Sequence, residues 1–170
     1  MGPKARFFAP TLLIGVLLPS APLAAQQPSG SPPGRNLADV TFTPTPGFPT
    51  CSQAVVQTGD PTKAPSILQG KLAAGCIIPW HWHSPNEHLM LVSGTARVEP
   101  KDGAPVTLQA GGFARLDSHH IHRFTCQTAC ILFVYSDGPL DMHYVDANGK
   151  EIPPEEALKA VKETPAKPTT

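Results

Sequence analysis

The chain has 170 residues, which suits one domain of ordinary size. Apolar residues make up 41% of it and charged residues 15%, so a hydrophobic core is expected, while 21 prolines and 14 glycines argue against long helices. Thirteen Lys and Arg residues against thirteen Asp and Glu residues leave no positive excess for a phosphate backbone, which excludes nucleic-acid binding as an expected function.

The first 25 residues have the layout of a secretory signal peptide. Lys4 and Arg6 precede an apolar stretch that runs to Leu18 without a charge. Pro19 and Ser20 end it, and the small pair Ala24 and Ala25 follows, although Leu23 stands where a small residue is usual. This pattern predicts a signal peptide over residues 1–25 and a mature protein that is secreted or periplasmic. The apolar stretch is shorter than the roughly 20 residues of a membrane-spanning helix, so no stable span is expected after processing; an uncleaved anchor is the alternative.

The remaining chain divides into four predicted parts. Residues 26–38 are rich in Pro, Gly, Ser and Gln and predict a disordered linker. Residues 39–148 form the predicted folded domain. Residues 149–163 predict one short helix, because two prolines and two glutamates suit its first turn and lysines its last. Residues 164–170 are predicted to be a disordered tail.

Short extended segments, separated by Gly, Pro, Asn and Asp, fill most of the predicted domain. Strands of this length and spacing predict an all-β sandwich or barrel. The expected strands are Ser66–Ala73, Cys76–His83, Glu87–Val92, Thr95–Pro100, Pro105–Leu108, Phe113–Leu116, His122–Cys126 and Ile131–Ser136.

Two histidines and a glutamate have the spacing of a metal site. His81 and His83 are two residues apart, so on a strand both side chains project from one face, and Trp82 projects from the other. Imidazoles roughly 6–7 Å apart along a strand can bind the same metal ion. After a turn, Glu87 can return a carboxylate to that ion, and two histidines with one carboxylate suit divalent iron. A pair of surface histidines is the alternative.

This segment resembles the first sequence motif of the cupins. The match covers Gly75, His81, His83, Glu87 and Gly94, with five, one, three and six residues between them. All specified positions of the motif are present. A chance coincidence of this set is rare, because Gly makes up only about 7% of residues on average.

The second cupin motif resembles the stretch from Ala110 to Phe124. In that motif a histidine supplies a further metal ligand, and the resemblance assigns this role to His122. His119 and His120 lie just before it and are the alternatives to that assignment, or solvent-facing loop residues. The stretch departs from the family pattern at three positions, where Asp, Pro and Asn are common: Gly112, Asp117 and Cys126.

The resemblance implies a cupin-type double-sheet β-barrel, or jelly roll, like that of secreted bacterial single-domain (quercetin dioxygenase-like) cupins. It implies one divalent metal ion per chain, held by His81, His83, Glu87 and His122, with Fe²⁺ as the first expectation and Mn, Ni, Zn or Cu as alternatives. A small-molecule substrate and a homodimer are further expectations. The implied function is that of a metal-dependent, dioxygenase-like oxidoreductase, and the alternative is a cupin that binds a metal or small ligand without catalysis.

Four cysteines in an exported chain indicate disulfides. Cys126 and Cys130 flank three residues, a loop of hairpin length, and a bond between them would leave Cys51 and Cys76 as the second pair. All three pairings remain open from the sequence. Alternatively, Cys126 lies on the His122 strand with the same parity and would be a soft metal ligand.

Further residues near the predicted site have expected orientations. His88 follows Glu87 and is expected to point out of the barrel. Leu89 and Leu91 share the face of Glu87, Phe124 shares that of His122, and all three are expected to form an apolar wall around the metal. Asp141 and His143 also share parity, which predicts either an acid–base pair or two hydrogen-bonded polar groups of a strand.

Overall fold

The computed structural model describes Gly2 and residues 34–162. Apart from Gly2, the predicted signal peptide (1–25) lies outside the described residues, as do most of the predicted linker and the predicted tail (164–170). The fold lies within the compact unit Asn36–Thr170. Over residues 34–162, eleven strands form two antiparallel sheets, and one α-helix follows them.

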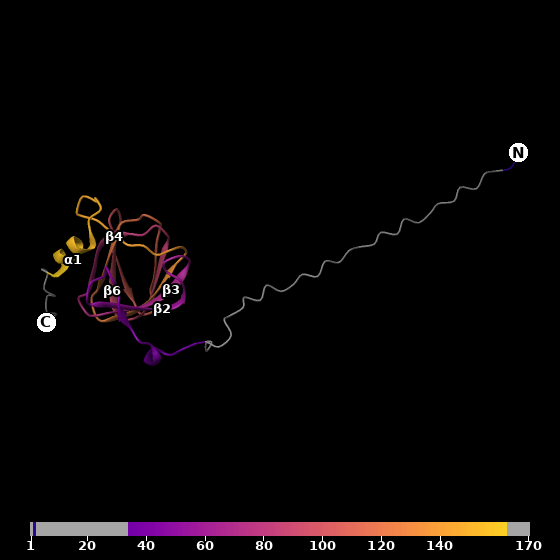
Figure 1. Cartoon of the computed structure of the whole chain (residues 1–170), viewed down its shortest axis with the longest axis horizontal. Helices are drawn as coiled ribbons and strands as arrows, with labels where there is room; N and C mark the ends of the chain where they lie inside the picture. Colours follow the sequence, from indigo (N-terminus) through magenta and orange to yellow (C-terminus); the bar gives the residue numbers. More distant parts are fainter. Residues whose placement is uncertain (1, 3–33, 163–170) are drawn as a thin grey trace. The chain divides into compact units, whose positions relative to one another are not determined.

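The two sheets enclose the core between them (Figure 1). This arrangement confirms the predicted all-β jelly-roll barrel. In spatial order, the six-stranded sheet contains β1 (Thr43–Pro44), β2 (Ser52–Gly59), β3 (Ser66–Leu72), β10 (Cys130–Ser136), β5 (Glu87–Ser93) and β8 (Phe113–Leu116). The five-stranded sheet contains β11 (His143–Tyr144), β4 (Ile77–Trp82), β9 (His122–Cys126), β6 (Thr95–Pro100) and β7 (Val106–Gln109).

All eight expected strands are present, as β3 to β10, and no end differs by more than one residue. The sequence reasoning missed β1, β2 and β11. Strand β2 has small or polar residues at its inner positions Ser52 and Ala54, so it lacks an apolar face with a period of two. Strands β1 and β11 have two residues each, which is too short for any periodic pattern, and they form only by pairing with β2 and β4.

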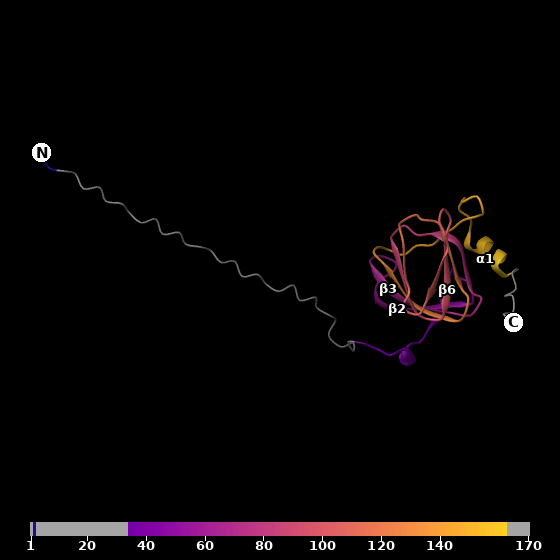
Figure 2. The same ribbon diagram turned by 180° about the vertical axis from the view of Figure 1, so that it is seen from behind.

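The predicted helix over 149–163 forms as α1 (Pro154–Lys162) and therefore begins later than expected. A tight turn precedes it, in which the Asp146 carboxylate accepts hydrogen bonds from the backbone N–H groups of Asn148 and Lys150. Helix α1 lies outside the barrel beside β4 and β11 and buries Ala157 there (Figures 1 and 2). Within residues 34–162, no helix has the length and apolar character needed to cross a membrane.

The structure contains one of the two disulfides considered from the sequence. Cys51 and Cys76 form a disulfide with a Cα–Cα distance of 5.7 Å, as the sequence reasoning allowed. The expected Cys126–Cys130 bond is wrong, since both residues are buried free thiols. The predicted hairpin is absent, because β9 lies in the five-stranded sheet and β10 in the six-stranded sheet and the three-residue loop crosses between them. The two thiols are still close enough to hydrogen bond to each other.

Candidate metal centre

A β-bulge in β4 orients the first histidine. Ile78 pairs with Phe124 of β9, but the next pair is His81 with His122, so β4 gains one residue between the two pairs. Pro79 lies in this bulge, where its missing N–H group breaks no ladder hydrogen bond. As a result Ile78 and His81, although three residues apart, both line the barrel interior.

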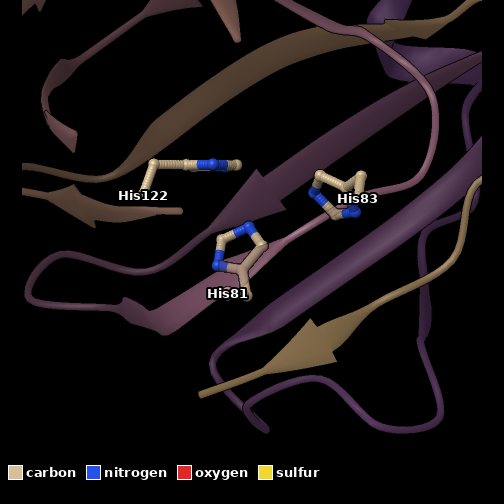
Figure 3. A group of neighbouring side chains, drawn as sticks. All are labelled: His81, His83 and His122. Atoms are coloured by element: carbon tan, nitrogen blue, oxygen red, sulfur yellow. The ribbon is translucent and has the colours of Figure 1, made fainter. Parts of the chain in front are cut away.

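The structure brings His81, His83 and His122 together inside the barrel, where their imidazoles face one another (Figure 3). One ring nitrogen of each lies within 4.8 Å of those of the other two. All three residues are buried, with 1–3% of their surface exposed. His81 and His122 are cross-strand partners, and His83 directly follows β4. The predicted choice of His122 over its neighbours His119 and His120 thus agrees with the geometry.

Hydrogen bonds fix the tautomer of each ring. In all three histidines, Nδ1 lies against a backbone carbonyl oxygen, which can only accept a hydrogen bond, so Nδ1 is the protonated nitrogen. The lone pair of the neutral ring is therefore on Nε2, and this nitrogen is the one available to a metal. The pairs are His81 with Pro79 at 2.6 Å, His122 with His120 at 2.8 Å, and His83 with Asp141.

Glu87 approaches the histidines from the opposite sheet, at the first position of β5. Its carboxylate oxygens lie 3.6 Å from Nε2 of His83 and 3.3 Å from Nε2 of His122. Both Nε2 atoms are buried and neither makes a hydrogen bond of good geometry within the described residues. Buried polar atoms without partners are rare in native proteins, and here they converge on one carboxylate. The structure therefore brings the three predicted histidine ligands together and places the carboxylate of Glu87 beside two of them, His83 and His122.

Electrostatics at the site favour a neutral His81 and an ionised Glu87. Burial is the largest effect that lowers the pKa of His81, and the adjacent His122 and His83 rings lower it further, to well below its ordinary value. Burial by itself raises the pKa of the Glu87 carboxyl, but the facing His83 and His122 rings outweigh it and the pKa falls. Neutral nitrogen donors beside one anionic oxygen donor match the needs of a divalent transition-metal ion.

The neighbouring histidines support the site without joining it. His119 donates a hydrogen bond from its backbone N–H to the carbonyl of His83 at 2.8 Å, and its ring stacks on Trp82. His120 contributes only the carbonyl that orients His122. His88 points away from the site, as predicted, and its ring lies beside Phe113.

Asp141 supports the site in a way that the sequence reasoning missed. Its backbone carbonyl accepts the Nδ1 proton of His83, and its carboxylate accepts a hydrogen bond from the backbone N–H of Ser84 at 2.7 Å. The predicted contact with His143 is present at 3.2 Å, and that ring also stacks on Trp82. No signal in the sequence marks this role, because the contact uses a backbone carbonyl 58 residues from His83.

A cavity of about 410 Å³ adjoins the four residues. Leu89 and Phe124 line it, as predicted, whereas Leu91 is buried in the core and does not line it. Further apolar side chains come from β3 and β10. The segment before β2 covers part of it through Thr45, Pro46 and Phe48. Tyr144 anchors this segment by donating a hydrogen bond from its hydroxyl to the carbonyl of Gly47 at 2.9 Å. Cavities of this size hold small organic molecules.

Cys126 does not reach the metal centre. Its thiol is buried between the sheets and hydrogen bonds to Cys130, and it is absent from the group of residues whose ligand atoms converge. Burial raises the pKa of the Cys126 thiol far above its ordinary value, and so the thiolate that would bind a metal is disfavoured. The alternative of a sulfur ligand is therefore not supported by the geometry.

Comparison with known proteins identifies the fold family. A family model for the cupin domain matches residues 69–135, the segment that contains His81, His83, Glu87 and His122. A search of the curated proteins finds no match to the sequence.

Solved structures match the same fold. An RmlC-like cupin from Ralstonia eutropha JMP134 is 18% identical, with 79% of this chain and 90% of that chain covered and a TM-score of 0.57. An RmlC-like cupin from Shewanella frigidimarina NCIMB 400 is also 18% identical, with a TM-score of 0.53. The match covers 64% of this chain and 92% of that chain. A structure of DMSP lyases is 20% identical, with a TM-score of 0.50. The match covers 56% of this chain and 53% of that chain. At these identities the likeness concerns the fold.

Proposed function

The chain is a member of the cupin superfamily, and we propose that it binds one divalent metal ion through His81, His83, His122 and Glu87. The convergence of three buried Nε2 atoms carries this proposal, because hydrogen bonds to backbone carbonyls leave each Nε2 with a free lone pair. The Glu87 carboxylate supports it by supplying a hard anionic donor from the opposite sheet.

Fe²⁺ is the proposed ion, with Mn, Ni, Zn and Cu as alternatives. Three imidazoles and one carboxylate suit several first-row metals, so ligand type alone does not select iron. When bound, the ion would supply open coordination positions for substrate oxygens and, in the case of iron, redox chemistry with dioxygen. The chain's own contribution is to fix the four donors beside a cavity whose lining is largely apolar.

The proposed activity is that of a metal-dependent oxidoreductase acting on a small organic molecule in the cavity. A non-catalytic, metal-holding binding protein is the second candidate, and one observation favours it. Among the described residues that line the cavity, Asp141 is the only acid or base besides the four proposed ligands, and its carboxylate is already held by Ser84 and His143. A reaction that needs a separate general base has no other group to use.

Metal content tests the proposed function. The protein, purified without chelators from the compartment where it resides, should contain one divalent ion per chain by elemental analysis, and His81→Ala should lose it. His88→Ala, on the outer face of the same sheet as Glu87, is the matched control and should keep the ion. Iron would support the oxidoreductase, and zinc or a substoichiometric mixture would support the binding protein. Absence of any ion after reconstitution with each candidate metal would refute the metal site.

We also propose that the protein is exported. The charged start and apolar stretch of the first 25 residues support export, and the Cys51–Cys76 disulfide suits an oxidising compartment. The intact mass of the protein recovered from the periplasm or medium should lack about 25 residues. Full-length protein in the membrane fraction would contradict cleavage.

A further inference from the structure

The walls of the cavity are apolar on both sides of the barrel. Leu68 and Leu72 of β3 and Leu132 and Val134 of β10 line it from the six-stranded sheet. Ile78 and Phe124 line it from the five-stranded sheet. A ligand that fills this space must therefore bury most of its surface against hydrocarbon, and apolar groups gain free energy from that burial.

Charged side chains in the cavity are few and all acidic. Among the described residues that line it, Glu87 and Asp141 carry the only formal charges apart from histidine, and no Lys or Arg contributes. A ligand carboxylate placed against the walls would lose its hydration and find no counter-charge. The hydroxyls of Thr45, Ser52 and Thr62 are too few to pair the several hydroxyls of a sugar.

Polar atoms that can anchor a ligand gather at the metal centre. The Nε2 atoms of His81, His83 and His122 and the Glu87 carboxylate form this end, and a metal held there accepts oxygen donors. We propose, resting on the proposed metal site, that the ligand has an apolar body without a charge and presents one or two adjacent oxygens to this end. Phenols, hydroxyketones and diketones belong to this chemical class, whereas sugars and molecules whose body carries a carboxylate against the walls do not.

A matched pair of probes tests this ligand class. 4-tert-Butylcatechol and 3,4-dihydroxybenzoate share the two adjacent hydroxyls and differ in an apolar or an anionic group on the ring. Calorimetric titration of the Zn²⁺-loaded protein, which does not oxidise catechols, should give at least tenfold tighter binding of the tert-butyl probe. Equal or tighter binding of the benzoate would overturn the proposal.

The same titration in metal-free protein separates this inference from the proposed metal site. The walls do not depend on the ion, so the tert-butyl probe should remain preferred although both probes bind more weakly. A protein that takes up no metal but keeps this preference would refute the metal site and support the ligand class. A protein that binds metal but prefers the benzoate would support the metal site and refute the ligand class.

Two methionines provide a matched pair of variants. Met142 is half-buried and lines the cavity, whereas Met90, also half-buried, follows the outward-pointing parity of His88 on β5 and does not line it. Met142→Lys should supply the missing cation, tighten benzoate binding and reduce the preference for the tert-butyl probe at least tenfold. Met90→Lys should leave the preference unchanged.

The stability of the variants is checked by thermal unfolding. If Met142→Lys does not fold, Leu140→Lys places the cation in the same cavity from a second half-buried position. A folded cavity variant with the wild-type preference would show that the walls do not select the ligand and would overturn the proposal.

Discussion

Strands β4 and β9 carry histidines at one end of the barrel and cysteines near the other. His122 begins β9 and Cys126 ends it, roughly 13 Å further along the strand. His81 lies in β4, and Cys76 directly precedes that strand. Both clusters are buried and draw on the same two strands, yet their chemistry differs. The histidine cluster holds unpaired nitrogens that face a cavity, whereas the cysteines are cross-linked or hydrogen-bonded to each other.

This difference separates a site built for a ligand from one built for stability. Buried polar atoms are satisfied within the protein unless something else completes them. At the cysteine end, Cys51–Cys76 is a closed bond, and the Cys130 thiol donates to the carbonyl of Thr128 at 3.2 Å. At the histidine end, the backbone satisfies each Nδ1 and leaves each Nε2 for a partner from outside the chain.

The largest expected effect concerns the metal increment to stability. A ligand that binds only the folded state at a hundred to a thousand times its Kd stabilises it by roughly 3–4 kcal/mol. Chelation should therefore lower Tm by several degrees, and His122→Ala should abolish this response. Cys126→Ala, on the same strand, should keep it. If chelation no longer lowered Tm in Cys126→Ala but still did so in His122→Ala, the metal would bind at the cysteine end of the barrel and not at the histidine end.

Removal of the disulfide should come next in size. Cys51–Cys76 closes a loop with a sequence separation of 25 residues, and the double substitution Cys51→Ser with Cys76→Ser should lower the free energy of unfolding by roughly 2–4 kcal/mol. Denaturant unfolding measures this change. Metal stoichiometry should stay at one per chain, because the disulfide touches none of the four proposed ligands. A variant that keeps its stability but loses metal would contradict the division of roles.

Acidity should weaken the histidine end. The pKa of His81 in the folded protein lies below the unfolded value of about 6.5, so this residue stabilises the fold above that pH and the contribution falls as pH drops below it. The imidazoles must also be neutral to bind metal, and metal affinity should fall at least tenfold per pH unit below about pH 6. Competition with a chelator at pH 7, 6 and 5 measures the affinity. A profile that stays flat down to the pH at which the fold itself is lost would contradict histidine ligands.

Asp141 should have a smaller effect on metal affinity. Asp141→Ala releases the segment whose carbonyl orients His83, and loss of such an outer partner typically weakens metal binding about 10- to 100-fold. Asp137→Ala is the matched control. The Asp137 carboxylate accepts hydrogen bonds from Asn86, in the turn between β4 and β5 where the Asp141 carboxylate binds Ser84, but it makes none to the proposed ligands. The visible spectrum of the Co²⁺-loaded protein should change only in Asp141→Ala. Equal effects of the two substitutions would assign Asp141 a purely structural role.

The smallest expected effect is at the free thiols. Burial raises the pKa values of both Cys126 and Cys130, so neither should react with iodoacetamide in the folded protein. Unfolding without a reductant should expose both to alkylation, whereas Cys51 and Cys76 should stay blocked, as mass spectrometry of the digested protein would show. If Cys126 and Cys130 react only after reduction, a second disulfide exists.

The sequence by itself determined the fold class and the three histidines that the fold brings together, and it placed Glu87 close to two of them. The H-x-H pair, Glu87 and the later His122 have fixed spacings along strands, and a strand's two-residue period places alternate side chains on one face. Strands β3 to β10 were predictable for the same reason, because each carries its own pattern of apolar and polar residues. The expected homodimer and the predicted export remain predictions.

Only the tertiary structure decided which atoms support those residues and what the cavity accepts. The bulge at Pro79, the Asp141 carbonyl beside His83 and the free state of Cys126 depend on how strands and distant segments pack together. Such contacts use backbone atoms common to every residue type, so no side-chain pattern announces them. The apolar walls likewise form only when two sheets face each other, since a strand pattern reveals an inward face but not the space between two such faces.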